Sequence, residues 1–340
     1  MDKKDRKTLK NSSLTKFIYK GFFLPKLVTA FLTACVGLIN FSAHSQDSYP
    51  SRPVSVIVPF QAGHGVDLMA RALSSEFSKI TGQAFPIINR EGAVGTIGFV
   101  ALAAAKPDGY TVAISPNTPL TILPHILKSV AYTYDSFVPV CQSFENVMAL
   151  FVGPASPYKT YQELVAAAKS QPGKFSWGTT GVGSVPHLSA SAWLATAGVD
   201  AVHVPFRGEP QLLPQLISNE ITFASASISG MAGKGVRPLA VFAEQRHFAY
   251  PDVPTMAELG HAAGVPGLNG MFAPRGTPES VLASLEKTCA EVTSSEGFRA
   301  SAARLNQRVS FLGRRDFDKR LRADFDEKAR LVKQLNIKAE

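Results

Sequence analysis

The sequence predicts an α/β protein with two domains, and three observations lead to this prediction. Strand-like apolar runs alternate with segments whose apolar residues recur at helical spacing, which favours α/β over all-β architecture. Two glycine-rich loops each follow such a strand and precede such a helix. About 295 residues remain after removal of the N-terminal segment described next, and a chain of that length usually divides into more than one domain.

The first 45 residues are predicted to be a cleaved signal peptide. A lysine-rich stretch precedes the uncharged apolar run 27–41, and Ala43-His44-Ser45 offers the small residues that signal peptidase requires. The run is 15 residues long, shorter than the roughly 20 that span a bilayer. Leu32-Thr33-Ala34-Cys35 resembles a lipoprotein box, so a lipid-bearing Cys35 is the alternative. Cleavage after Ser45 is favoured because the apolar run continues well past Cys35.

Composition argues against nucleic-acid binding. The leader carries 8 of the 35 Lys and Arg and 2 of the 26 Asp and Glu, so the remaining chain has a net charge of only +3. No basic stripe with interleaved aromatic residues is left. Cys141 and Cys289 remain, and their spacing fits either a disulfide in an oxidising compartment or two buried thiols.

The first glycine loop carries the most functional information. Val54 to Val58 reads as a buried strand, the loop 61–65 contains Gly63 and Gly65, and a helix is expected from Leu68 with Asp67 as N-cap. A strand, a glycine loop and a helix N-terminus together form an anion site, although ordinary βα connections look the same. The loop lacks the lysine of a phosphate loop, and Leu68 stands where a dinucleotide fingerprint needs glycine.

Further elements are expected along the chain. Thr160 and Glu163 form a capping box for a helix through Lys169, and Thr277-Pro278 opens another helix with proline at its first position. The last element, 316–335, reads as an amphipathic helix docked on the body. The expected later strands are 110–115, 148–152, 202–204, 221–224 and 238–242. Similar apolar segments at 150–154 and 270–274 suggest two strands that cross between the domains, with the second domain inserted in the first.

A second glycine loop spans 177–184 and leads into a helix at Pro186. Its glycines, its hydroxyls on Thr179, Thr180 and Ser184, and the helix end are the components of an anion site, but also those of a simple capped helix. Two such loops that face each other would hold a carboxylate without an arginine.

Enzymatic motifs fit poorly. Ser184 does not lie in G-x-S-x-G, and neither C-x-x-C nor H-E-x-x-H occurs, so no catalytic residue, metal or cofactor is predicted. Single histidines are scattered along the chain, and only His64, inside the first loop, is a candidate for ligand contact.

These landmarks resemble the periplasmic receptors of tripartite tricarboxylate transporters, also called Bug proteins. The likeness runs from Gln46 to the C-terminus. It rests on Tyr49-Pro50-Ser51-Arg52-Pro53, Pro59-Phe60 with Gly63, Gly65 and Asp67, Asn89-Arg90-Glu91-Gly92-Ala93 with Gly95 and Ile97-Gly98, Lys106-Pro107-Asp108-Gly109-Tyr110-Thr111, Gly178 with Gly181, Gly183-Ser184 and His187-Leu188, His203-Val204-Pro205-Phe206-Arg207-Gly208 and Pro251-Asp252-Val253-Pro254-Thr255.

The resemblance implies a type II periplasmic-binding-protein fold, with two α/β lobes joined by two crossover strands. Lobe 1 would comprise residues 46–148 and 271–340, and lobe 2 residues 149–270. A small carboxylate, bound partly through water, would lie between them in a monomer that serves a membrane permease. The implied ligand-binding residues are Phe60, Ala62, Gly63, His64, Asp67, Asn117, Thr118, Thr179, Gly183 and Ser184, with Asp67 expected to pin the loop rather than touch ligand.

Three departures from the family pattern bear on specificity. His64 replaces a usual glycine, Ala226 stands where many members have aspartate, and residues 231–235 look shortened. They suggest an anionic carboxylate without a primary amine. Two alternatives to a transport receptor remain: a receptor coupled to a signalling partner, and a secreted hydrolase that uses Ser184.

Overall fold

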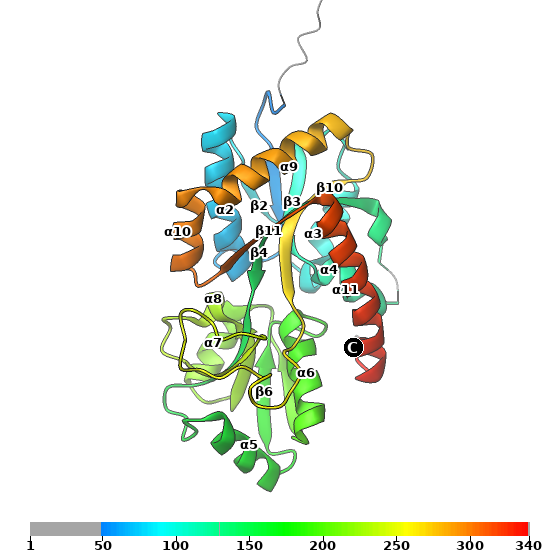
Figure 1. Cartoon of the computed structure of the whole chain (residues 1–340). Helices are drawn as coiled ribbons and strands as arrows, with labels where there is room; N and C mark the ends of the chain where they lie inside the picture. Colours follow the sequence, from blue (N-terminus) through cyan, green and yellow to red (C-terminus); the bar gives the residue numbers. More distant parts are fainter. Residues whose placement is uncertain (1–48, 129, 339–340) are drawn as a thin grey trace, which may run out of the picture. The chain divides into compact units, whose positions relative to one another are not determined.

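The computed structural model describes residues 49–128 and 130–338. The predicted signal peptide, including both Cys35 and Ser45, lies outside the described residues. Within the described part of the chain, no helix combines the length and apolarity needed to cross a bilayer. The described residues form two α/β lobes, each built around its own sheet (Figure 1).

The first lobe is built on a mixed sheet of six strands. These are β1 (Ser55–Val58), β2 (Ile87–Asn89), β3 (Thr111–Pro116), β4 (Phe137–Asn146), β10 (Gly267–Pro274) and β11 (Arg308–Gly313), in the order β11-β4-β10-β3-β1-β2. β1 pairs in parallel with β2 and β3, whereas β10 is antiparallel to β3 and β4. The unalternating apolar run of β1 is explained by burial on both faces, because Val56 and Val58 join one core cluster and Ile57 joins another.

The second lobe has a mixed sheet of five strands. These are β5 (Met148–Val152), β6 (Phe175–Thr179), β7 (Ala201–Pro205), β8 (Phe223–Ser227) and β9 (Arg237–Phe242), in the order β7-β6-β8-β5-β9. The predicted strand at 221–224 is displaced: β8 begins at Phe223, since Ile221 and Thr222 form the turn that enters it. The two faces of this sheet also pack into separate apolar clusters.

Helices cover both sheets. The first lobe carries α2 (Gly65–Thr81), α3 (Thr96–Ala103), α4 (Thr118–Thr121), α9 (Glu279–Ser294), α10 (Glu296–Arg304) and α11 (Arg314–Gln334). The second carries α5 (Tyr161–Ser170), α6 (Val185–Ala197), α7 (Glu209–Ile217) and α8 (Ile228–Met231). The capping box of Thr160 and Glu163 is confirmed. Pro278 is the N-cap of α9 and not its first helical residue, because its ψ of 144° is extended.

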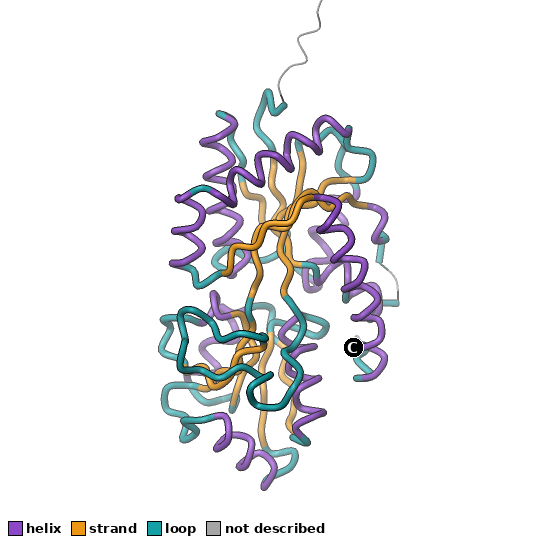
Figure 2. The backbone as a smooth tube through the Cα atoms, viewed as in Figure 1, coloured by secondary structure: helices purple, strands orange, loops and turns teal. Residues whose placement is uncertain are grey.

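Two strand connections join the lobes, as the fold prediction requires. β4 leads into β5 through Val147 alone, and the chain returns from β9 to β10 through the segment 243–266 (Figure 2). β5 and β10 begin within a few residues of the predicted lobe boundaries, while the lobe ranges themselves stay a prediction. The segments 150–152 and 270–274 are sheet strands next to the crossings, one in each lobe.

A disulfide joins Cys141 in β4 to Cys289 in α9. Both residues are fully buried in the core between the first sheet and its helices α2, α9 and α10. The sequence left open whether these cysteines pair, and the structure places their Cα atoms 6.6 Å apart. The bond ties a helix to the strand that leads to the second lobe.

The C-terminal helix α11 docks on the body as predicted. Phe317 and Leu321 are buried in the first lobe, whereas Val332 belongs to the apolar core of the second. The helix lies beside α6 at its C-terminal end (Figure 1). α11 is therefore a third link between the lobes, in addition to the two strand connections.

Candidate functional site

A small cavity of about 30 Å³ lies between the two lobes, at the carboxyl ends of strands from both sheets. Its lining consists of Phe60, His64, Val66, Val94, Pro116, Thr118, Asn146, Met148, Thr180, Ser184, Val185, Pro186, Glu209, Ser227 and Gly267. A wider hollow of about 660 Å³ shares Phe60, Val94 and Thr180 with it and forms its outer part. The carboxyl ends of strands are the usual ligand position in open α/β folds.

The first glycine loop is held in place by the carboxylate of Asp67. His64, not Asp67, is the N-cap of α2, because its Nδ1 accepts the N–H of Val66 at 3.2 Å. Asp67 lies one turn further on, where its carboxylate accepts the N–H of Gly63 at 2.9 Å and both donors of Arg71 at 3.0 Å. Burial alone would raise the pKa of Asp67, but hydrogen bonds from Arg71, Asn89 and Gly63 hold it below its usual value. The expectation that Asp67 pins the loop agrees with these bonds.

The second glycine loop is fixed by a histidine. Ser184 is the N-cap of α6: its Oγ accepts the N–H of His187 at 3.3 Å and donates to the carbonyl of Gly181 at 2.7 Å. His187 Nδ1 in turn accepts the N–H of Gly183 at 3.2 Å, which requires an unprotonated nitrogen. Burial, aided by the neighbouring His203, lowers the pKa of His187 to about 3. The imidazole therefore stays neutral and keeps the loop in place.

An ionisable residue of the first lobe, His64, contacts an ionisable residue of the second lobe, Glu209, across the cavity. His64 Nε2 lies 2.7 Å from Oε2 of Glu209, the first residue of α7, and their side chains are 7% and 3% exposed. The distance is that of an ion pair, but the ring N–H is not aligned for a hydrogen bond, and Oε2 has no hydrogen-bond partner among the described residues. Phe60 stacks on His64 with ring centroids 4.7 Å apart, which holds the imidazole in this position.

Several glycines lie where the lobes are in close contact. A Cβ on Gly65 would lie 2.4 Å from Ser229 Oγ, one on Gly181 3.1 Å from Val94, and one on Gly183 2.7 Å from Ile126. Each pair joins one lobe to the other. Gln61 adds a hydrogen bond of 3.3 Å to the carbonyl of Arg207. The structure therefore describes the lobes in contact around the cavity.

Four predicted site residues line this cavity. They are Phe60, His64, Thr118 and Ser184. Ala62 and Gly63 are exposed at the outer side of the first loop, while Asp67, Thr179 and Gly183 act within the loops. Asn117 does not line the cavity: its amide donates to Asp324 at 2.6 Å, and Asp324 pairs with the buried Lys328 of α11.

The sequence analysis missed Asn146, Ser227 and, above all, Glu209 as cavity residues, whereas Thr180 was noted for its hydroxyl in the second glycine loop. The signal at Glu209 is weak, because a glutamate in the first turn of a helix is normally explained by the helix dipole. Ala226 does not line the cavity but packs in an apolar cluster of the second lobe, so the missing aspartate has no direct effect there. The lack of an aspartate at position 226 therefore does not support the expectation of a ligand without an amine, because Glu209 supplies a carboxylate to the cavity.

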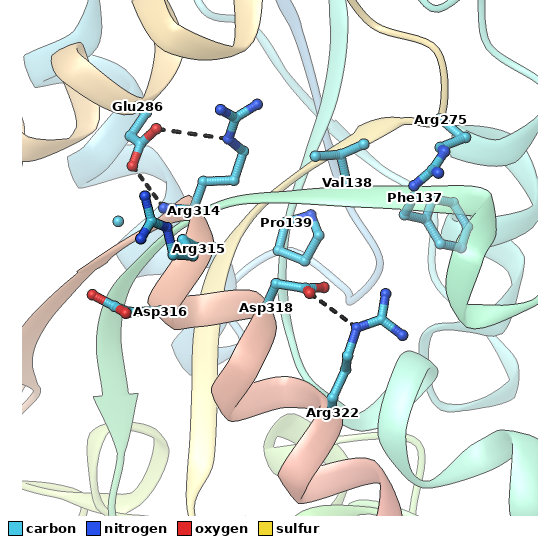
Figure 3. A pocket seen from close by; sticks show the side chains of 11 residues that line it. Phe137, Val138, Pro139, Arg275, Glu286, Arg314, Arg315, Asp316, Asp318 and Arg322 are labelled. Atoms are coloured by element: carbon cyan, nitrogen blue, oxygen red, sulfur yellow. Dashed lines mark hydrogen bonds and ion pairs between the residues drawn. The ribbon is translucent and has the colours of Figure 1, made fainter. Parts of the chain in front are cut away.

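A separate hollow of about 670 Å³ lies at the start of α11 in the first lobe (Figure 3). Arginines surround it, but Arg314 contacts Glu279 and Glu286, and Arg322 pairs with Asp318 at 2.9 Å. Arg275 and Arg315 also line it and form no ion pair among the described residues, but no residue of either glycine loop belongs to this lining. Among the described residues, no group of three or more His, Cys, Asp and Glu side chains is placed to hold a metal ion.

Two α/β lobes with a cavity of mixed polar and apolar lining between them define a solute-binding protein. The model of the tripartite tricarboxylate transporter family receptor matches residues 69–337, and the chain belongs to this family. A UPF0065 protein of Bordetella pertussis is 33% identical over 263 residues, covering 76% of this chain and 81% of that protein.

Solved structures agree with this assignment. R. palustris Rpa4515 with adipate matches with a TM-score of 0.81 and 26% identity, covering 85% of this chain and 99% of that chain. MatC from Rhodopseudomonas palustris with bound malate matches with a TM-score of 0.76 and 27% identity, covering 84% of this chain and all of that one (100%). Both similarities include the two lobes.

Proposed function

We propose that the protein is a periplasmic receptor that captures a small carboxylate between its lobes and delivers it to the membrane permease of a tripartite tricarboxylate transporter. The observation that carries this proposal is the cavity framed by both glycine loops, with His64, Thr118 and Thr180 in its lining, in a chain of the receptor family. Adipate and malate in two related structures support a carboxylate ligand. The predicted signal peptide supports the periplasm, and capture and delivery require only a monomer.

The ligand donors would be side chains more than backbone amides. The N–H groups of Gly63, Gly183 and Ser184 already donate within the loops, to Asp67, His187 and the carbonyl of Gly181. The hydroxyls of Thr118 and Thr180 and the ring of His64 lie around the cavity, whereas the Ser184 O–H already donates to the Gly181 carbonyl. Donors to a carboxylate form charge-assisted bonds of about 1.5–3 kcal/mol each, and ordered waters can bridge the remainder.

Phe60, His64, Thr118 and Ser184 would then contact the ligand or its waters. Ala62, Gly63, Asp67, Asn117, Thr179 and Gly183 would support them from the loops and from the end of β3. Ligand contacts that are better in the closed arrangement than in an open one would drive the lobes together. The permease would recognise the closed form.

Binding is favoured over hydrolysis by the state of Ser184. Its hydroxyl donates to the carbonyl of Gly181, and the nearest ring nitrogen of the following helix, His187 Nδ1, is engaged by Gly183. A serine nucleophile needs a base that accepts its proton, and His187 is not placed to do so. We therefore assign no catalytic role to Ser184.

A thermal-shift screen of residues 46–340 tests the proposal. Mono-, di- and tricarboxylates, amino acids and aromatic acids would be compared at high concentration. A ligand at 100 times its Kd adds about 2.7 kcal/mol of stability, which is easily seen as a rise in Tm. We expect at least one carboxylate to raise Tm and the rise to be lost in Gly183→Val, because the backbone φ of +78° at this position disfavours valine. A screen in which no carboxylate raises Tm would contradict the proposal.

A further inference from the structure

We propose that Glu209 determines which carboxylates this receptor accepts. The cleft would select a small monocarboxylate that also carries a hydrogen-bond donor, such as an ammonium, amide or hydroxyl group, and would disfavour a dicarboxylate. The inference rests on the proposed function, because it requires a carboxylate ligand in this cavity.

The first support is a buried acceptor directed into the cavity. The Glu209 side chain is 3% exposed and lines the cavity, yet its Oε2 has no hydrogen-bond partner among the described residues. Asn146 Oδ1, from the end of β4, is a second buried acceptor in the same lining without such a partner. Buried polar atoms are almost always paired in native proteins. With Oε2 met only by the His64 nitrogen at 2.7 Å and Asn146 Oδ1 met by no donor, the cavity offers two acceptors to a ligand that donates.

The second support is the charge of the site. Burial would raise the pKa of Glu209, but the charge of the nearby His64, the backbone N–H of Glu209 and Lys234 together hold it below its usual value. The position at the start of α7 favours the anion further. Neither Lys nor Arg lines the small cavity beside Glu209, although Arg207 lines its wider outer part. A second ligand carboxylate beside Glu209 would therefore meet like charge in a poorly solvated space.

The third support is the way Glu209 is held when the lobes touch. Oε1 and the carbons of the Glu209 side chain pack against Gly230, which leaves Oε2 facing His64 of the other lobe. A cavity of about 30 Å³ has room for roughly one water, so a ligand enters only if the lobes part or His64 turns away. Either movement separates His64 from Oε2. A ligand donor is then required to replace it.

The test uses pairs of acids that differ only at one end. Succinate and succinamate, and the corresponding pairs with three, five and six carbons, have the same size but carry a carboxylate or an amide at the second end. Calorimetric Kd values would be measured at pH 7 for the wild-type protein, Glu209→Gln and Glu209→Asp. Glu220→Gln is the control, because it makes the same charge change at an exposed position of the second lobe.

We expect the wild-type protein and Glu220→Gln to prefer the monoamide at least tenfold. In Glu209→Gln the preference for the monoamide should fall below threefold, mainly through tighter binding of the dicarboxylate. Glu209→Asp keeps the carboxylate and should still prefer the monoamide. Measurable binding with an unchanged ratio in Glu209→Gln would overturn the inference and leave the proposed function standing. If the wild-type protein bound none of these acids and no carboxylate of the thermal-shift screen, the proposed function would fail, and the inference with it.

Discussion

Gly65 offers a direct test of lobe closure, because a single methyl group there acts on closure and not on folding. Gly65 is the first residue of α2 and is not among the glycines with positive φ, so alanine suits its backbone. In an open arrangement, Gly65→Ala should stabilise the helix by up to about 1 kcal/mol. In the closed arrangement, the new Cβ would lie 2.4 Å from Ser229 Oγ.

The size of the effect follows from this overlap. Ser229 Oγ must move by about 1 Å, and its hydrogen bond of 2.8 Å with Ser227 Oγ would be lost. Overpacking of this kind costs about 1–3 kcal/mol. Because the cost falls on the closed arrangement, which ligand binding requires, the Kd of the best carboxylate should rise about 5- to 150-fold, while Tm without ligand should stay equal or rise if the ligand-free protein is open.

Ser229→Ala provides the matched rescue. With the hydroxyl removed, the nearest atoms to the Cβ of residue 65 would be Gly230 N and Ser229 Cβ, both at 3.6 Å, which is an ordinary contact. The double variant should therefore regain most of the lost affinity, and calorimetry of the four proteins measures the coupling. Wild-type affinity in Gly65→Ala, or no recovery in the double variant, would refute this account of closure.

Three further results are expected. Gly183→Ala should lower ligand affinity more than Gly63→Ala, because both have positive φ but only the Cβ on residue 183 would enter the other lobe; equal Kd values in calorimetry would contradict this. Acidification from pH 6.5 towards pH 4 should lower the free energy of unfolding, and His187 should contribute up to about 1.4 kcal/mol per pH unit to this loss, because burial lowers its pKa to about 3 and only the unfolded chain takes up the proton. Urea titrations at several pH values give the free energy of unfolding at each pH. Its decrease per pH unit should be smaller in His187→Gln, and an unchanged decrease would refute the assignment of a lowered pKa to His187. Reduction of the Cys141–Cys289 disulfide, which spans 148 residues, should cost about 2–5 kcal/mol of stability without changing Kd; a large change in Kd would show that the bond also shapes the cleft.

The architecture could be predicted well from the sequence because its signals are local. The apolar run of β1, the capping box of α5 and the glycine loops each depend on neighbours within a few residues. The capping prediction at the first loop was wrong in detail: Asp67 was expected as N-cap, but His64 takes that position. Asp67 lies on the first turn because its carboxylate can then bond both Gly63 and Arg71.

The composition of the cavity could not be predicted in the same way. Glu209 looks like an ordinary first-turn glutamate, and its burial comes from packing against Gly230 and from His64, which lies in the other lobe. Asn117 shows the reverse case, since its position after β3 suggested ligand contact, but its amide bonds Asp324 of α11. Both outcomes depend on tertiary contacts between residues far apart in the sequence.

The central claim is that a carboxylate binds between the two glycine loops and brings the lobes together. Hydrogen–deuterium exchange of residues 46–340, with and without the best carboxylate of the thermal-shift screen, tests it most directly. The account predicts slower amide exchange in both loops, residues 61–68 and 179–188, and in the first turn of α7. Protection confined to one lobe, or to the arginine-lined hollow of Figure 3, would contradict it.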